Sequence, residues 1–247
     1  MTQGLEASSP PRHIASMKET GPASPLPRHY HEAMRLDLTR AELVADGVVH
    51  AVGILFTLCA GSVLLALAFF HTGPWEYVAA IFYVASMLTV FSVSCAYNLW
   101  PASRAKWILR RFDHAAIYLL LAGTYTPFLA QIDDPAISTT MIAVVWGAAL
   151  FGMTIKLALP GRFDRLAVAF YLAIGWSGVT VAEAIVSVLP PATIALIVAG
   201  GVVYSSGVVF FAWRGLRFST AVWHGFVVGG AALHLAAVMN ALVIDRL

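Results

Sequence analysis

The sequence predicts an all-α protein, an integral membrane bundle of seven transmembrane helices with its N-terminus in the cytoplasm. Two observations lead to this prediction: seven apolar segments follow one another along the chain, and the basic residues gather in alternate connections between them. Composition agrees, because 60% of the residues are hydrophobic and only 11% are charged, against about 25% charged in soluble globular proteins.

Each apolar segment is long enough to cross a bilayer, which takes about 20 residues. The segments cover residues 44–70, 77–99, 115–132, 137–159, 166–189, 192–213 and 221–244. The first is preceded by Thr39-Arg40-Ala41-Glu42, a capping-box pattern that predicts a helix start there. Pro127 lies inside the third segment and is expected to kink the helix or to end its regular part.

Lysine and arginine are confined to alternate connections, which fixes the predicted orientation. The connections after the second, fourth and sixth segments hold Arg104, Lys106, Arg110 and Arg111, then Arg162 and Arg165, then Arg214 and Arg217. The connections after the first, third and fifth hold neither residue type. Basic connections mark the cytoplasmic side, so we expect a multi-pass protein of the cell (inner) membrane with its C-terminus outside.

The chain divides into a tail and one membrane domain. Residues 1–38 are rich in proline and serine and predict a disordered or interfacial cytoplasmic tail. Residues 39–247 form the predicted seven-helix transmembrane domain. The net charge of +2 is small and sits in connections, so it indicates orientation and not a nucleic-acid surface. We therefore expect membrane lipids as partners and no nucleic acid.

Polar side chains inside the predicted spans are costly and each needs a reason. They gather near the cytoplasmic ends of four segments, often four residues apart, a spacing that puts two side chains on one helix face. The residues are Glu42, Asp46 and His50; Ser94 and Asn98; Asp113 and His114; and Thr220 and His224, with His234 deeper in the last segment. Four polar faces at one depth predict a polar cavity in the cytoplasmic leaflet.

Simpler interpretations of single residues stay open. Asp113 is also suited to cap a helix and to pair with Arg110 or Arg111. Ser94 and Asn98 are also ordinary partners for hydrogen bonds between membrane helices. His50 or His234, taken alone, is equally a histidine satisfied inside the bundle.

Residues 111–127, Arg-Phe-Asp-His-Ala-Ala-Ile-Tyr-Leu-Leu-Leu-Ala-Gly-Thr-Tyr-Thr-Pro, resemble the third helix of the hemolysin III proteins. These form the bacterial branch of the progestin and adiponectin receptor superfamily. Three further places resemble the family: Glu42-x-x-x-Asp46-x-x-x-His50, Ser94-Cys95-Ala96-Tyr97-Asn98, and the run from Trp223-His224 to His234. Seven helices with the N-terminus inside is also the family's arrangement.

The resemblance implies a zinc ion near the cytoplasmic leaflet and hydrolysis of lipid amides such as ceramide. The family's ligands are one histidine of the second helix and a His-x-x-x-His pair that opens the seventh, with an aspartate that holds a water molecule. On this chain the ligand positions are Asn98, Thr220 and His224, the aspartate is Asp113, and Ser94 supports the site.

The chain departs from the family at two of the three ligand positions, since Asn98 and Thr220 replace histidines. An amide and a hydroxyl are poor zinc ligands beside imidazole. The leading hypothesis is therefore a degenerate zinc site in a protein that binds a lipid or fatty-acyl ligand or is weakly active. One alternative is a ceramidase-like zinc amidase with rearranged ligands, to which His50 or His114 contributes. Another is a small-solute or proton transporter with Glu42, Asp46 and His50 as its relay.

Overall fold

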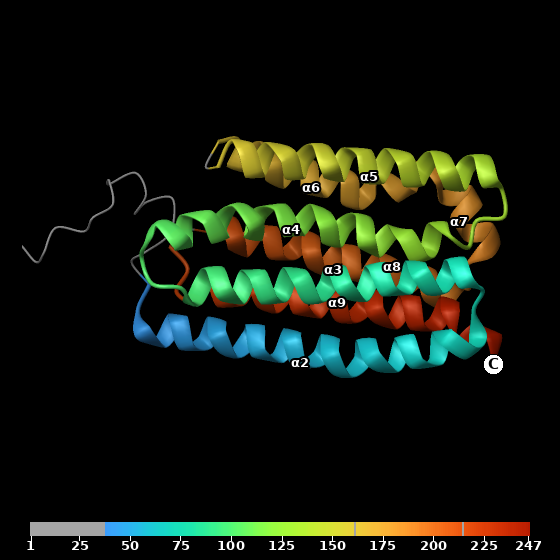
Figure 1. Cartoon of the computed structure of the whole chain (residues 1–247), viewed down its shortest axis with the longest axis horizontal. Helices are drawn as coiled ribbons and strands as arrows, with labels where there is room; N and C mark the ends of the chain where they lie inside the picture. The colour runs from blue at the N-terminus through green and yellow to red at the C-terminus, as the bar shows by residue number, and fades with distance from the viewer. Residues whose placement is uncertain (1–37, 161, 214) are drawn as a thin grey trace, which may run out of the picture.

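The computed structural model describes residues 38–160, 162–213 and 215–247, and every regular element in these ranges is helical (Figure 1). The elements are α2 (Arg40–His71), α3 (Pro74–Leu99), α4 (Arg104–Leu129), α5 (Pro135–Ala158), α6 (Asp164–Trp176), η1 (Ser177–Val181), α7 (Ala182–Val188), α8 (Pro191–Ala212), α9 (Ser219–Leu242) and η2 (Ile244–Arg246). The all-α prediction is confirmed. Residues 1–37 lie outside the described ranges, so the predicted tail stays a prediction.

The long helices lie side by side along the longest axis of the molecule (Figure 1). Helix α2 packs against α3 and α9, α4 packs between α3 and α5, and α8 packs against α9. One end of the bundle holds the starts of α2, α4, α6 and α9 together with the basic connections. We call it the basic end; it is the end predicted to face the cytoplasm.

Six helical stretches of the described chain are long and apolar enough to cross a membrane. They are Arg40–His71, Pro74–Leu99, Pro135–Ala158, Leu166–Val188, Pro191–Ala212 and Ser219–Arg246. Helix α4 has 26 residues and lies among them (Figure 1), but its first turns carry Arg104, Lys106 and Arg110. The molecule is a multi-pass membrane bundle, while the seventh crossing and the sidedness of the termini stay predictions.

Local caps set the helix starts. The predicted capping box of α2 is confirmed, because the Thr39 amide donates to Glu42 Oε2 at 2.9 Å and the Glu42 amide donates to Thr39 Oγ1 at 3.3 Å. Ser103 Oγ accepts from the Lys106 amide and so starts α4 at Arg104. The sequence predicts an apolar segment that begins at residue 115, eleven residues after the start of α4. The difference arises because hydropathy marks where apolar side chains begin and not where the backbone becomes helical.

The fifth predicted segment is broken into α6, η1 and α7. The break follows Trp176, and a side chain from α4 compensates for the lost helical bonds. The Tyr125 hydroxyl donates to the carbonyl of Gly175 at 2.8 Å and accepts from the amide of Gly178 at 2.9 Å. Irregular backbone at membrane depth is tolerated where protein groups satisfy it in this way.

Glycines allow close packing between neighbouring helices. A Cβ atom on Gly152 of α5 would lie 2.4 Å from Cε1 of Tyr118 on α4, whereas one on Gly147, also on α5, meets nothing within 4 Å. Tyr118 is buried and its ring packs against Tyr171 with the centroids 4.5 Å apart. The α4–α5 contact therefore depends on the missing side chain at position 152.

Candidate metal centre

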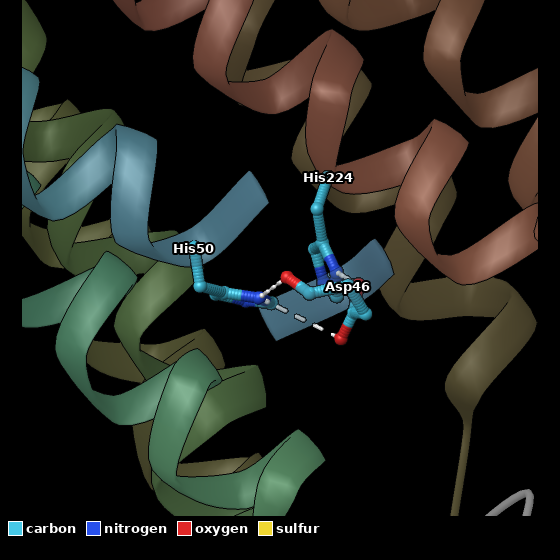
Figure 2. Close-up of side chains that lie close together, drawn as sticks. All are labelled: Asp46, His50 and His224. Atoms are coloured by element: carbon cyan, nitrogen blue, oxygen red, sulfur yellow. Dashed lines mark hydrogen bonds and ion pairs between the residues drawn. The ribbon is translucent and has the colours of Figure 1, made fainter. Parts of the chain in front are cut away.

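Three side chains with metal-ligating atoms meet near the basic end of the bundle. Asp46 and His50 come from α2 and His224 comes from α9, and each offers one ligand atom within 4.8 Å of the others (Figure 2). Asp46 and His50 are fully buried, and the His224 side chain is 12% exposed. This is the only such group of three or more residues among the histidines, cysteines and carboxylates that the structure describes.

The Asp46 carboxylate contacts both histidines. Its Oδ1 atom lies 2.6 Å from Nδ1 of His224, which is a short, charge-assisted hydrogen bond. Its Oδ2 atom lies 3.5 Å from Nδ1 of His50. The two imidazole rings meet edge to face with their centroids 4.3 Å apart. One carboxylate thus orients two rings from two helices.

The hydrogen bonding of His50 leaves one ring nitrogen available. Its Nδ1 atom lies 2.8 Å from the backbone carbonyl oxygen of Asp46. A carbonyl oxygen only accepts, so Nδ1 carries the proton and Nε2 carries a lone pair. His50 Nε2 and Asp46 Oδ2 are both buried without a hydrogen-bond partner. Buried polar atoms without partners are rare in folded proteins and require an explanation.

This donor set fits zinc. Catalytic zinc sites use three protein ligands, commonly two imidazoles and one carboxylate, and keep a fourth position open. A ligating histidine usually donates its other N–H to a backbone carbonyl or a carboxylate. In this centre Nδ1 of His50 faces a backbone carbonyl oxygen, and Nδ1 of His224 faces a carboxylate oxygen. The two buried atoms without partners, Asp46 Oδ2 and His50 Nε2, are of the kinds that a metal ion would use.

A hydrogen bond one turn before the centre fixes α9 beside α2. The Phe218 amide donates to Glu42 Oε1 at 3.1 Å. Phe218 precedes α9 with a left-handed φ of 60°, and this turn directs the first residues of α9 into the bundle. The Glu42 carboxylate thus accepts hydrogen bonds at the starts of both helices, from Phe218 before α9 and, through Oε2, from Thr39 in the capping box of α2. Its described contacts are structural.

The residues that the family resemblance points to lie on the Nε2 side of His224. Ser94 Oγ lies 3.4 Å from that nitrogen. The Asn98 amide group donates to the carbonyl oxygen of Ser94 at 2.9 Å and to its hydroxyl at 3.2 Å. Asp113 interacts with Ser94 and with His224. Thr220 is buried one turn before His224, and its hydroxyl has no hydrogen-bond partner.

Two of the predicted histidines lie apart from the centre. His114 faces the start of α6, with Nδ1 3.9 Å from Asp164 Oδ1. His234 lies deeper in the bundle, where its Nε2 atom is 3.2 Å from the carbonyl oxygen of Ile197 and its ring stacks on Tyr204. Neither histidine belongs to the group formed by Asp46, His50 and His224.

A cavity of about 1120 Å³ adjoins the centre. Residues of all the helices from α2 to α9 line it, and most of them are apolar. Asn98, Asp113, Thr220 and His224 line its polar part, and His234 also lies on its wall. Its size lies just above the usual range of small-molecule sites, about 300–1,000 Å³.

The comparison with known protein families agrees with the motifs and the fold. The profile of the family described as "Haemolysin-III related" matches residues 41–235, most of the chain. The chain belongs to the hemolysin III family. Membership places it among multi-pass membrane proteins, as the apolar helices require.

Individual relatives include bacterial and animal proteins. The chain is 34% identical to the Hemolysin-3 homolog of Bacillus subtilis over 194 residues, which are 78% of this chain and 91% of that protein. It is 31% identical to Hemolysin-3 of Bacillus cereus over 198 residues, or 80% and 90% of the two chains. It is 28% identical to the human monocyte to macrophage differentiation factor over 174 residues, or 68% and 72%.

Sequence reasoning noted Asp46, His50 and His224 but did not join them into one centre. The spacing of four residues placed Asp46 and His50 on one helix face. No local signal showed that this face of α2 meets α9, from which His224 comes 178 residues after Asp46. The two buried atoms without hydrogen-bond partners, Asp46 Oδ2 and His50 Nε2, can be recognised only in the packed bundle.

Proposed function

We propose that this hemolysin III family member is a lipid-binding membrane protein that holds one zinc ion on Asp46, His50 and His224. The observation that carries the proposal is the buried donor set, in which Asp46 Oδ2 and His50 Nε2 have no hydrogen-bond partner. In this arrangement Asp46 and His50 supply the two ligands that Asn98 and Thr220 do not. The site is rearranged and keeps only His224 of the family's expected ligand set.

The adjoining cavity supports a lipid as the ligand. Apolar residues from seven helices enclose a volume that suits an acyl chain, while the polar residues Asp113 and His224 line one part of it. A lipid bound there would keep its chain among apolar side chains and present its polar linkage to the centre. The exposed Val179 and Val186 line the same cavity beside the break between α6 and α7. Lipid from the bilayer therefore has a short route into the cavity.

A second candidate is hydrolysis of a lipid amide. Zinc, when bound, polarises a carbonyl group and makes water more acidic. Asp113 lines the cavity beside Ser94 and His224 and is the carboxylate placed to accept a proton there. Asp46 holds the His224 ring in position through the 2.6 Å hydrogen bond. The surrounding apolar walls exclude bulk water from the amide.

Metal analysis tests the proposed centre. Protein purified in detergent without chelators is expected to carry about one zinc per chain by mass spectrometry of its metal content. His50→Ala and His224→Ala should each lose most of this zinc, because two ligands hold the ion far more weakly than three. His71→Ala is the matched control, since His71 lies at the opposite end of α2 and outside the centre. Zinc retained in both site variants would refute this ligand set.

Hydrolysis is tested separately on a ceramide-like amide in mixed micelles. Turnover that a chelator abolishes and zinc restores would support the amidase, and Asp113→Asn should then lower the rate by about a hundredfold or more, the usual contribution of a general base. Zinc binding without any cleavage would leave the protein a lipid binder. Cleavage that survives both the chelator and Asp113→Asn would refute the second candidate.

A further inference from the structure

Two polar side chains line the deep part of the cavity, far from the polar part beside the proposed metal centre. They are His234 on α9 and Tyr204 on α8. His234 follows His224 by ten residues, which places it about 15 Å farther along α9. Apolar residues, among them Val198 and Val227, line the same cavity. We call His234 and Tyr204 the deep polar pair.

Each ring of the deep polar pair rests on a glycine of the opposite helix. A Cβ atom on Gly200 of α8 would lie 2.9 Å from Nε2 of His234, and one on Gly230 of α9 would lie 2.8 Å from the Tyr204 ring. The two rings stack with their centroids 5.4 Å apart and their planes 24° from parallel. Nε2 of His234 also lies 3.2 Å from the carbonyl oxygen of Ile197. Packing and this contact together hold the imidazole in one orientation.

The Nδ1 atom of His234 has no partner in the part of the protein that the structure describes. The carbonyl oxygen of Ile197 only accepts, so Nε2 carries the proton and Nδ1 presents a lone pair. Only 9% of His234 is exposed, and Nδ1 is buried without a hydrogen bond. The Tyr204 hydroxyl likewise forms no hydrogen bond with the described residues. Helix packing explains where the two rings lie, but a buried polar atom without a partner needs a separate explanation.

We infer that the deep polar pair binds a hydroxyl group on the distal half of a fatty-acyl chain whose head lies at the metal centre. The chain occupies the same cavity as the proposed lipid, so this site depends on the proposed function. An alcohol satisfies both members of the pair, because it donates to Nδ1 of His234 and accepts from the Tyr204 hydroxyl. The distance of about 15 Å from His224 is about half of the roughly 30 Å hydrocarbon core, which is the reach of one acyl chain in a leaflet. A hydroxyl beside the lipid head lies too near the metal centre to contact the pair.

Binding of fatty acids to the protein in detergent, measured by competition with a fluorescent fatty acid, tests the deep polar pair. Stearate, 2-hydroxystearate and 12-hydroxystearate share one chain length and one carboxylate head, so they differ only in the presence and place of the hydroxyl. We expect 12-hydroxystearate to bind about tenfold more tightly than the other two, which corresponds to about 1.4 kcal/mol. The ketone 12-oxostearate keeps an acceptor at the same carbon but cannot donate to Nδ1. It should therefore bind less tightly than the alcohol.

Two variants remove the polar atoms of the pair and keep its rings. His234→Phe removes Nδ1, and Tyr204→Phe removes only the hydroxyl. Each should reduce the ratio between the affinities for 12-hydroxystearate and stearate toward one. Because the ratio compares two ligands on the same preparation, a partly misfolded sample does not produce this result. Tyr77→Phe is the matched control and should keep the full ratio, because Tyr77 lies on α3 and does not line the cavity.

The possible failures of this site and of the proposed function can be told apart. Equal affinities for 12-hydroxystearate and stearate in the parent, or a preference that survives His234→Phe, would overturn the deep polar pair and leave the lipid-binding proposal intact. Equal binding of the alcohol and the ketone would also overturn the pair, since Nδ1 of His234 needs a donor. No binding of any of the four fatty acids would overturn both proposals.

Discussion

The Nδ1 atom of His224 lies 2.6 Å from Oδ1 of Asp46, although 178 residues separate them in the chain. The contact joins the start of α2 to the start of α9, and the Asp46 side chain is fully shielded from solvent. The same carboxylate is 3.5 Å from His50. Asp46 is therefore the residue on which the mutual orientation of both imidazoles depends.

Restoring the two missing histidines should create a second way to hold zinc. Asn98→His with Thr220→His places imidazoles near the Nε2 side of His224, where Ser94 lies 3.4 Å away. Residues 220 and 224 are one turn apart, so their side chains meet on one face. The double variant should bind zinc more tightly than the parent, and each single variant should gain less. Zinc affinity is measured by competition with a chromogenic chelator.

The parent and the double variant should also differ in their need for His50. His50→Ala should abolish tight zinc binding in the parent but leave it largely intact in the double variant. The same loss of zinc in both backgrounds would show that positions 98 and 220 do not face a common site with His224.

A methyl group at Gly152 should destabilise the bundle. Its Cβ atom would lie 2.4 Å from the buried Tyr118 ring, so α4 and α5 must separate or the ring must move. Overpacking of this kind costs about 1–3 kcal/mol. Gly147→Ala is the control on the same helix, because nothing lies within 4 Å of its added methyl group. Thermal unfolding in detergent should show a lower midpoint for Gly152→Ala only.

Asp164 should give the bundle a small pH dependence at its basic end. Burial alone would raise the pKa of Asp164, but hydrogen bonds from Lys156 and Arg110 and their charges hold that pKa below its usual range. His114 also faces the carboxylate, at 3.9 Å. A lowered folded-state pKa stabilises the fold above the unfolded value of about 3.9 and loses this effect as pH falls through the folded value.

The measurement compares the wild type with Asp164→Asn from pH 7 to pH 2. The wild type should be more stable at neutral pH, and the difference should shrink below about pH 4. The pH-dependent part is at most about 1 kcal/mol, because the Asp164 side chain is 41% exposed and solvent screens the pair. A difference that stays constant over the whole range would contradict the assignment.

The predicted sidedness is open to cysteine labelling. With Cys59 and Cys95 replaced by alanine, a cysteine at Ala102 should react with an impermeant reagent only after the membrane is opened. A cysteine at Asp133 should react in intact cells. Both positions are exposed and lie in connections at opposite ends of the bundle. The reverse labelling pattern would invert the topology.

The helical fold was predictable because its signals are one-dimensional. Segment length, hydropathy and the positions of arginine and lysine are all read along the chain. The break between α6 and α7 was not predictable, since single glycines such as Gly175 and Gly178 are common in continuous membrane helices. What stabilises the break is the Tyr125 hydroxyl, which arrives from another helix.

The site was predictable as a list of polar residues but not as a group. Spacing showed which side chains share a helix face, and the family resemblance drew attention to Asn98, Thr220 and His224. The structure instead brings His224 against Asp46 and His50. That pairing depends on which face of α2 meets α9, which is set by packing and by the bond from Phe218 to Glu42.

The placement of the centre on α2 and α9 bears on how the protein is made. Ribosomes deliver α2 to the membrane first among the described helices and α9 last of the long ones. A growing chain therefore carries Asp46 and His50 through most of its synthesis with His224 still untranslated. The centre can close only when α9 has entered beside α2, so the zinc ligands come together only after every other long helix described here has been synthesised.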